Sequence, residues 1–255
     1  MLAATAVTIT VVSAPTAQPG SAGGLPARDG GRRPLRAEAD GHVRIPIAER
    51  LPTRLPAEGV PAGWEVKEFL GRADVELVRV DGALAVRLRS ERTSYALHRD
   101  VMVDLREQPM LAWSWKVVEL PAGGDVRRVG TDDQAAQLYV VFPRWPTPQR
   151  TSDVIGYVWD TTAPAGTRLT SPKAENVKII VVESGPSAVG QWRSYVRDVA
   201  EDYRALFGRQ APRVGHIAVM IDTNDTRRAA ETLVRGLVFR PTDVTRGETP
   251  TSMLR

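Results

Sequence analysis

The sequence predicts an all-β fold: an antiparallel β-sandwich of jelly-roll type with one helix. The chain holds about nine or ten short apolar runs separated by turn-rich connections, a spacing typical of sandwiches. Two of these runs, Met110–Val118 and Ala135–Phe142, flank a glycine-rich charged loop and have the composition of central strands. One later stretch changes to helical spacing, which accounts for the single helix.

A hairpin is predicted where the first clear strands, Val75–Val80 and Ala83–Ser90, are joined by Asp81-Gly82. An Asp-Gly pair between apolar runs favours a type I′ turn, because both central residues then need positive φ. In the second strand, apolar side chains at even positions alternate with mostly basic ones at odd positions. This pattern predicts one buried and one solvated face.

The helix is predicted over Ser194–Phe207, because apolar side chains recur there at three- and four-residue spacing and Gly208 follows as a cap. Asp198 and Asp202 are then four residues apart, on a face expected to be solvated. The other predicted strands are Tyr95–Val101, Val154–Trp159, Val177–Val182, His216–Asp222 and Leu233–Phe239.

The domain organisation follows from composition. Residues 1–22 contain the apolar run Leu2–Val12, too short to span a bilayer, followed by small residues and proline. We interpret them as a signal segment, with a disordered Ala/Thr-rich tail as the alternative. Residues 23–62 are predicted to be a Pro/Gly/Arg-rich linker, 63–240 the β-sandwich domain, and 241–255 a polar tail. The expected location is extracytoplasmic, with no membrane span in the mature chain.

Composition excludes several classes of protein. The net charge is +4 with a pI near 9.7, but the basic residues are scattered among acids, which argues against nucleic-acid binding. The sequence has no cysteine, so thiol nucleophiles, disulfides and cysteine-based zinc sites are excluded. A nucleophile elbow, a phosphate-binding glycine loop and a dinucleotide fingerprint are also missing from the sequence.

The candidate ligand-binding residues are Asp132, Asp133, Trp113, Trp115 and Lys116. The two aspartates end the loop before a predicted strand, where one carboxylate caps the loop or binds a sugar hydroxyl or a cation. The two indoles share one strand face and serve either as core or as a stacking surface for a sugar. The lysine points to the opposite face, toward solvent or the second sheet.

A possible calcium site is predicted at Asp222, Asn224 and Asp225, which offer oxygen ligands where a strand ends. Turn formation or helix capping is the alternative role for these side chains. If this loop and the Asp132-Asp133 loop meet at one rim of the sandwich, their oxygen atoms converge on one site.

Several motifs occur together in one order: WSWK, DDQAAQLYVVF, YVW, a GQW…RDV..DY…FG run, and IDTNDT at Ile221–Thr226. In this combination the chain, from about Trp64 to Phe239, resembles an uncharacterised bacterial family of exported proteins, domain of unknown function 3047. The resemblance implies a β-sandwich similar to galactose-binding and carbohydrate-binding jelly rolls. It implies no activity or ligand.

The leading functional hypothesis is an exported, non-catalytic binding module for a glycan or cell-envelope polymer. One alternative is a glycoside hydrolase that uses carboxylates from Asp132, Asp133, Asp222 or Asp225, since such enzymes need a pair of acids. A structural envelope protein is the other alternative. Neither enzyme activity nor oligomeric state is determined by the sequence.

Overall fold

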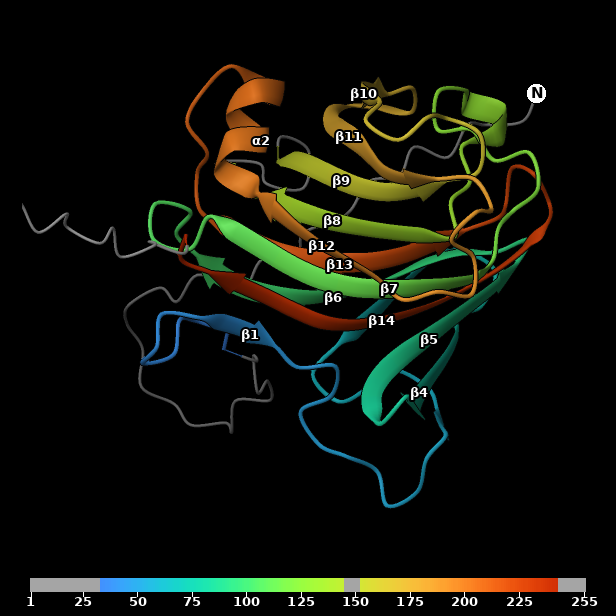
Figure 1. Cartoon of the computed structure of the whole chain (residues 1–255), viewed down its shortest axis with the longest axis horizontal. Coiled ribbons are helices and arrows are strands. Elements are labelled where there is room, and N and C mark those ends of the chain that lie inside the picture. Colours follow the sequence, from blue (N-terminus) through green and yellow to red (C-terminus); the bar gives the residue numbers. More distant parts are fainter. Residues whose placement is uncertain (1–32, 145–151, 243–255) are drawn as a thin grey trace, which may run out of the picture.

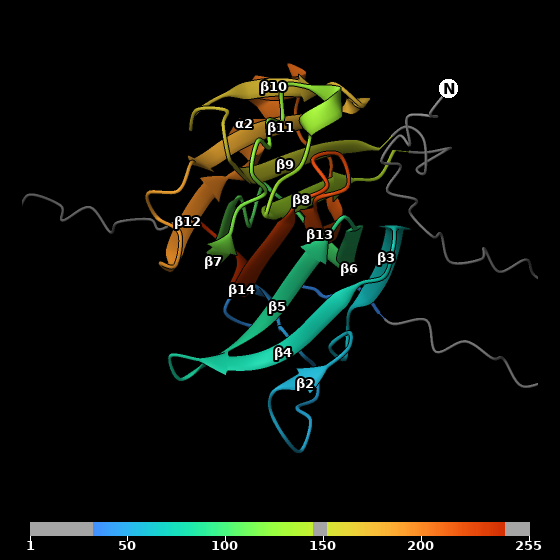
Figure 2. The ribbon, with the colours of Figure 1, turned by 90° about the vertical axis from the view of Figure 1, so that its right-hand side faces the viewer.

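The fold is a sandwich of two seven-stranded sheets, which confirms the predicted class; Figures 1 and 2 show the two layers. The structure is a computed structural model and describes residues 33–144 and 152–242. Pairing between the strands of the two sheets is antiparallel, apart from the parallel pair β9 and β11.

Sheet I has the order β12-β7-β14-β5-β4-β2, and β1 also pairs with β14. Its strands are β1 (Val43–Ile45), β2 (Ala57–Glu58), β4 (Asp74–Val80), β5 (Ala83–Glu91), β7 (Met110–Glu119), β12 (Arg193–Asp198) and β14 (Ala229–Arg240). The β4–β5 hairpin is the one expected, since Asp81 and Gly82 have φ of 52° and 78°.

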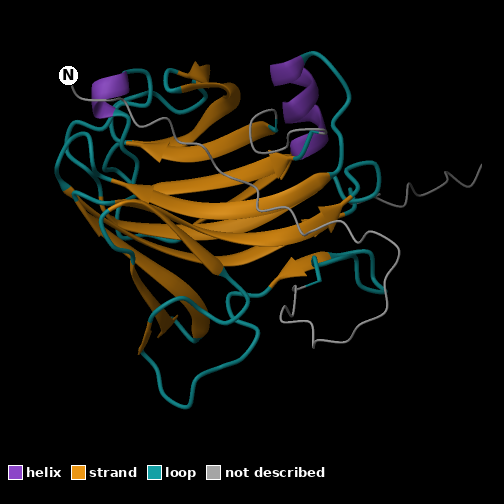
Figure 3. Cartoon of the chain, turned by 180° about the vertical axis from the view of Figure 1, so that it is seen from behind, coloured by secondary structure: helices purple, strands orange, loops and turns teal. Residues whose placement is uncertain are grey.

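Sheet II has the order β10-β11-β9-β8-β13-β6-β3. Its strands are β3 (Glu65–Leu70), β6 (Ser94–Val103), β8 (Ala136–Phe142), β9 (Asp153–Asp160), β10 (Arg168–Ser171), β11 (Ala174–Ser184) and β13 (Val214–Asp222). The helix α2 (Val199–Phe207) and a 3-10 turn (Val129–Thr131) lie near opposite ends of the strands, as Figure 3 shows.

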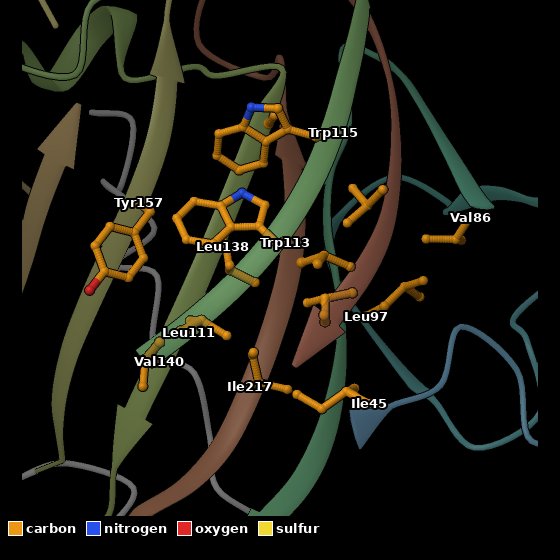
Figure 4. Packing of buried hydrophobic residues seen from close by; sticks show 14 of the residues in the cluster. Ile45, Val86, Leu97, Leu111, Trp113, Trp115, Leu138, Val140, Tyr157 and Ile217 are labelled. Carbon is orange, nitrogen blue, oxygen red and sulfur yellow. The ribbon is translucent and has the colours of Figure 1, made fainter. Parts of the chain in front are cut away.

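The main core lies between the two sheets and is organised around β7. Alternate residues of this strand, Leu111, Trp113, Trp115 and Val117, are at most 1% exposed. Figure 4 shows the two indoles facing sheet II, and the Trp113 ring lies 5.2 Å from that of Tyr157. Period-two alternation along β7 therefore produces the inter-sheet packing directly.

The helix prediction over Ser194–Phe207 is wrong in its first part, because residues 193–198 form strand β12 against β7. The extended chain stacks Tyr195 on Trp113, with ring centroids 5.2 Å apart, and a helix would turn the tyrosine away. The helix itself begins at Val199, where the Asp198 carboxylate accepts the Glu201 backbone N–H at 2.9 Å. It ends before Gly208, whose φ is 68°, as expected.

The linker prediction for residues 23–62 is wrong in its second half. Strand β1 buries Val43 and Ile45 against the core and pairs with β14. The Pro46 carbonyl accepts a hydrogen bond from the Trp64 indole at 3.1 Å, so this proline-containing segment packs against the domain. The predicted signal segment 1–22 and residues 243–255 of the predicted tail lie outside the described residues. Among the residues described, no helix is long and apolar enough to cross a membrane.

Replacing Trp113 by alanine should lower the free energy of unfolding by about 3–5 kcal/mol, because it opens a cavity between the sheets. Urea denaturation checks this value. The matched control is Val118→Ala on the same strand, where the side chain is 40% exposed and the expected change is within about 0.5 kcal/mol. Equal midpoints for both variants would contradict the core role of the indole.

Candidate functional site

The structure brings the two predicted acidic loops together. Strands β8 and β13 are antiparallel neighbours, so the loop before β8 meets the loop after β13. The Asp133 carboxylate accepts the backbone N–H groups of Asp225 at 3.2 Å and Thr226 at 2.5 Å. We call this cluster the acidic rim and define it as Asp132, Asp133, Asp222, Asn224 and Asp225.

Lys173, in the turn between β10 and β11, supplies the opposite charge to the acidic rim. Its Nζ lies 2.5 Å from Asp225 Oδ2 and 3.6 Å from Asp132 Oδ2. The side chains of Lys173 and Asp132 are each 10% exposed, so this ion pair is buried. The sequence offered no signal for Lys173, because only sheet pairing brings the β10–β11 turn to this rim.

Burial shifts the pKa values of three side chains in and beside the acidic rim. It raises the pKa of Asp132 to about 6, against the opposing effect of the Lys173 charge. Burial, and then the charge of Asp133, raises the pKa of Asp222 well above its usual range. Burial alone lowers the pKa of Lys173, but the surrounding carboxylates, Asp132 foremost, bring it above its usual value. Lys173 therefore stays charged, and burial favours the protonated forms of Asp132 and Asp222.

The cavity beside the rim is small. Asp132, Asp222 and Lys173 line it together with Gln137 and Tyr139, and its volume is about 20 Å³. A single water needs roughly 10–15 Å³ by this kind of measure, so the cavity takes about one water. A sugar ring does not fit there, and the carboxylates already have partners within the protein.

The three residues predicted to bind calcium also have partners. The Asp222 carboxylate accepts the Asn224 N–H at 3.3 Å, and the Asn224 amide donates to Asp225 at 3.1 Å. Lys173 supplies a positive charge where calcium was expected to supply one. In the described ranges, no group of three or more His, Asp or Glu side chains is arranged to hold a metal ion.

The predicted residues on β7 lie away from the acidic rim. Trp113 and Trp115 are each 1% exposed, so the interpretation as core is correct and stacking on a ligand at the surface is excluded. Lys116 is half-buried on the outer face of sheet I, where it lies opposite Leu233 of β14. These three residues therefore do not form a site with the aspartates.

A larger depression lies between the edges of the two sheets, where β12 of sheet I approaches β11 and the start of β10 of sheet II. We call it the lateral groove; its volume is about 410 Å³, within the range of ligand pockets. Its lining includes Arg168, Ile180, Val182, Tyr195, Val196 and Arg197. Of its aliphatic members, Ile180 and Val182 continue the core outward.

Tyr195 is held firmly in the groove. Its ring stacks on Trp113 at an interplanar angle of 27° and lies 5.4 Å from Trp115. Its hydroxyl donates to Glu183 Oε2 at 3.0 Å. Burial raises the pKa of Tyr195 to about 12, so the phenol stays neutral at physiological pH. The two tryptophans thus support a groove residue from behind instead of meeting a ligand themselves.

Asp202 organises the charged side of the groove from helix α2. Its carboxylate accepts hydrogen bonds from the Tyr157 hydroxyl and Arg197 Nε, each at 2.9 Å, and from Arg197 Nη2. The side chain is 3% exposed, so the expectation of a solvated face for Asp202 is wrong. A buried carboxylate needs such partners, and they fix Arg197 at the groove.

The groove residues are not among the predicted site residues. Tyr195 and Arg197 fall in the segment predicted to be a helix, and Arg168 lies in a region without an apolar pattern. The alternation of Tyr195 and Arg197 with Ser194 and Val196 was the signal for a strand. No local pattern indicates that this strand borders β11.

Replacing Asp132 by asparagine should remove a pH dependence of stability. A carboxyl whose folded pKa is raised from 3.8 to about 6 contributes stability that is fully present below pH 3.8 and lost as pH rises through about 6. Relative to the parent, the variant should therefore gain about 1–3 kcal/mol of unfolding free energy between about pH 4 and pH 8. Urea titrations across this range measure the difference.

The control for this pH series is Glu58→Gln, at an exposed carboxylate of β2. It should follow the parent at every pH. A constant difference between Asp132→Asn and the parent across the series would mean that the Lys173 ion pair, and not burial, dominates at this position.

Comparisons with known proteins relate the chain to others by family and by fold. Searching curated protein sequences gives no match. The carbohydrate recognition domain of Emp47p is similar at 13% identity and a TM-score of 0.42, covering 80% of this chain and 97% of that one. The xyloglucanase domain of NopAA from Sinorhizobium fredii is similar at 9% identity and a TM-score of 0.40, covering 75% and 100%.

The enzymatically active domain of bacteriophage CBA120 tailspike protein 4 has 9% identity and a TM-score of 0.39. The match covers 71% of this chain but only 20% of that chain. At these identities the likenesses concern the sandwich fold alone and carry no information on function. The model of the family DUF3047, described as a protein of unknown function, matches residues 62–238. The chain therefore belongs to the DUF3047 family.

Proposed function

We propose that this chain is an exported, non-catalytic binding module for a glycan, such as a cell-envelope polymer, and that the glycan binds in the lateral groove. The observation that carries the proposal is the groove itself: about 410 Å³ lined by an aromatic ring, aliphatic side chains and two guanidinium groups. Sugars present apolar C–H faces together with hydroxyl groups. The groove presents apolar side chains and polar groups side by side, and this combination matches both.

The position of the groove supports the binding of an extended ligand. Strand β12 ends sheet I, and β10 ends sheet II, so both sides of the groove border on a sheet edge. Terminal strands have backbone donors and acceptors that the sheet does not use. A chain of sugar hydroxyls lying along β12 has such groups within reach.

A second open depression, of about 300 Å³, lies among Asp74, Arg89, Glu91 and Glu119. Its described lining contains no aromatic ring, and Arg89 is paired there with Asp74 at 3.1 Å. It therefore lacks the apolar platform that a sugar ring needs, and we place the glycan in the lateral groove.

We propose a binding module without catalytic activity because the carboxyl groups of the described residues do not face the lateral groove. A glycoside hydrolase needs two carboxyl groups facing an open cleft. The described lining of the lateral groove contains no carboxylate, and the acids of the acidic rim enclose a space of about one water. Hydrolysis of a bound glycan by the parent protein would overturn this part of the proposal.

Export is also part of the proposal, and it rests on the apolar run Leu2–Val12, which lies outside the described residues. Expression of the full chain in a bacterial host, followed by cell fractionation and N-terminal sequencing, tests it. The expected product is a shortened chain outside the cytoplasm. An uncleaved chain found wholly in the cytosol would contradict export.

Val182→Glu should weaken glycan binding by roughly tenfold or more, because it places a bulkier charged group in the groove. The Val182 side chain is only partly buried, and far-UV circular dichroism checks that the variant is folded. The measurement is a glycan array followed by titration calorimetry on the glycans that bind the parent. Val118→Glu, at an exposed valine outside the groove, is the matched control and should bind as the parent does.

The outcomes of this experiment are distinct. If the parent binds no glycan on the array, the function is not glycan binding, and a structural role becomes the better explanation. If the parent binds and Val182→Glu binds equally well, the ligand lies elsewhere on the protein.

A further inference from the structure

We infer that the lateral groove selects glycans that carry carboxylate groups, that is, polysaccharides containing uronic acids, and that Arg168 is the residue that recognises the carboxylate. This inference rests on the proposed function and names its ligand class. It follows from how the charges around the groove are distributed between buried and open positions.

The two groove arginines, Arg168 and Arg197, share one buried carboxylate, that of Asp202. The Asp202 carboxylate is bound on both oxygen atoms by Arg197 and on Oδ2 by the Tyr157 hydroxyl as well. Arg197 is held in place by these bonds, with its side chain 31% exposed. One carboxylate is therefore matched to one guanidinium inside the protein.

Arg168, the first residue of β10, interacts with Asp202 more weakly than Arg197 does. Its ion pair to Asp202 Oδ1 is long, at 3.9 Å, and that oxygen already accepts from Arg197. The Arg168 side chain is 51% exposed, so its guanidinium is largely open to solvent on the groove side. A second positive charge thus stands at the groove without a carboxylate of its own.

Two further acids lie on the groove strands beside lining residues, and both have partners. Glu183 of β11 accepts at Oε2 from Arg193 Nε and the Tyr195 hydroxyl, each at 3.0 Å. Asp198, the last residue of β12, accepts the Glu201 backbone N–H at 2.9 Å as the cap of helix α2. The described groove lining has two arginines and no acid. The groove therefore presents net positive charge to its ligand.

These charges favour a carboxylate-bearing sugar over a neutral one. A guanidinium forms two parallel hydrogen bonds to a carboxylate, and such charge-assisted bonds are stronger than those to hydroxyl groups. The apolar lining formed by Ile180 and Val182 suits the C–H face of the same ring. A uronic acid carries both features on one pyranose.

The experiment compares each acid with its own neutral form. Oligosaccharides of galacturonan, glucuronan and alginate are titrated against the full chain, each beside its fully methyl-esterified counterpart. At least one acid should bind, and its ester should bind roughly tenfold more weakly. Binding of the acid should also weaken as salt rises.

Arg168→Gln should lower the affinity for the acid to that for its ester and leave the affinity for the ester unchanged. Arg168→Lys should retain part of the preference, because the charge remains while the paired hydrogen bonds are lost. The matched control is Arg72→Gln, between β3 and β4 at the opposite edges of the sheets, where the side chain is 93% exposed. It should bind as the parent does.

The possible failures separate the two claims. If the parent binds neutral glycans as tightly as acidic ones, the inference is wrong and the proposed function stands. The same holds if Arg168→Gln keeps the preference for acidic glycans. If Arg72→Gln weakens binding as much as Arg168→Gln, the attraction is general and the groove does not select. If the parent binds no glycan at all, the proposed function itself fails.

Discussion

The stacking of Tyr195 on Trp113 is the contact on which the rest of the arrangement depends. Trp113 fills the space between the sheets and contacts Tyr157 on sheet II, while Tyr195 extends the same aromatic column to the sheet edge. Aromatic pairs bury large areas and prefer defined geometries, so the column fixes β12 against β7. The lateral groove has its shape because that edge strand cannot shift.

Two buried polar clusters join separate parts of the chain. At one, Asp133 ties the loop before β8 to the loop after β13, and Lys173 connects both to the β10–β11 turn. At the other, Asp202 connects helix α2 to β12 and β9. Burying a charge is costly unless it has partners, so each cluster is stable only in the assembled sandwich. The clusters differ in their surroundings: the first is closed around its own cation, and the second stands beside a groove with a further arginine.

The strands with strong alternation were predictable from the sequence. The pattern of β5, the Asp81-Gly82 turn and the paired indoles of β7 each follow from period two and turn chemistry, and each is present in the structure. Strands β3 and β10 were missed because, as terminal strands, they bury few side chains and show little apolar pattern. Strand β12 was assigned to a helix because Val196 is in helical register with Val199 and Tyr203.

The sequence by itself determined the fold class and the core face of the central strands. It also determined that the two acidic loops lie at strand ends. Those properties depend on local spacing, which a single chain segment carries. Tertiary structure alone decided that Lys173 neutralises the acidic loops and that Arg168, Tyr195 and Arg197 border one groove. These residues lie on edges of different sheets, and the order of strands in a sheet depends on pairing between distant segments, which no local pattern encodes.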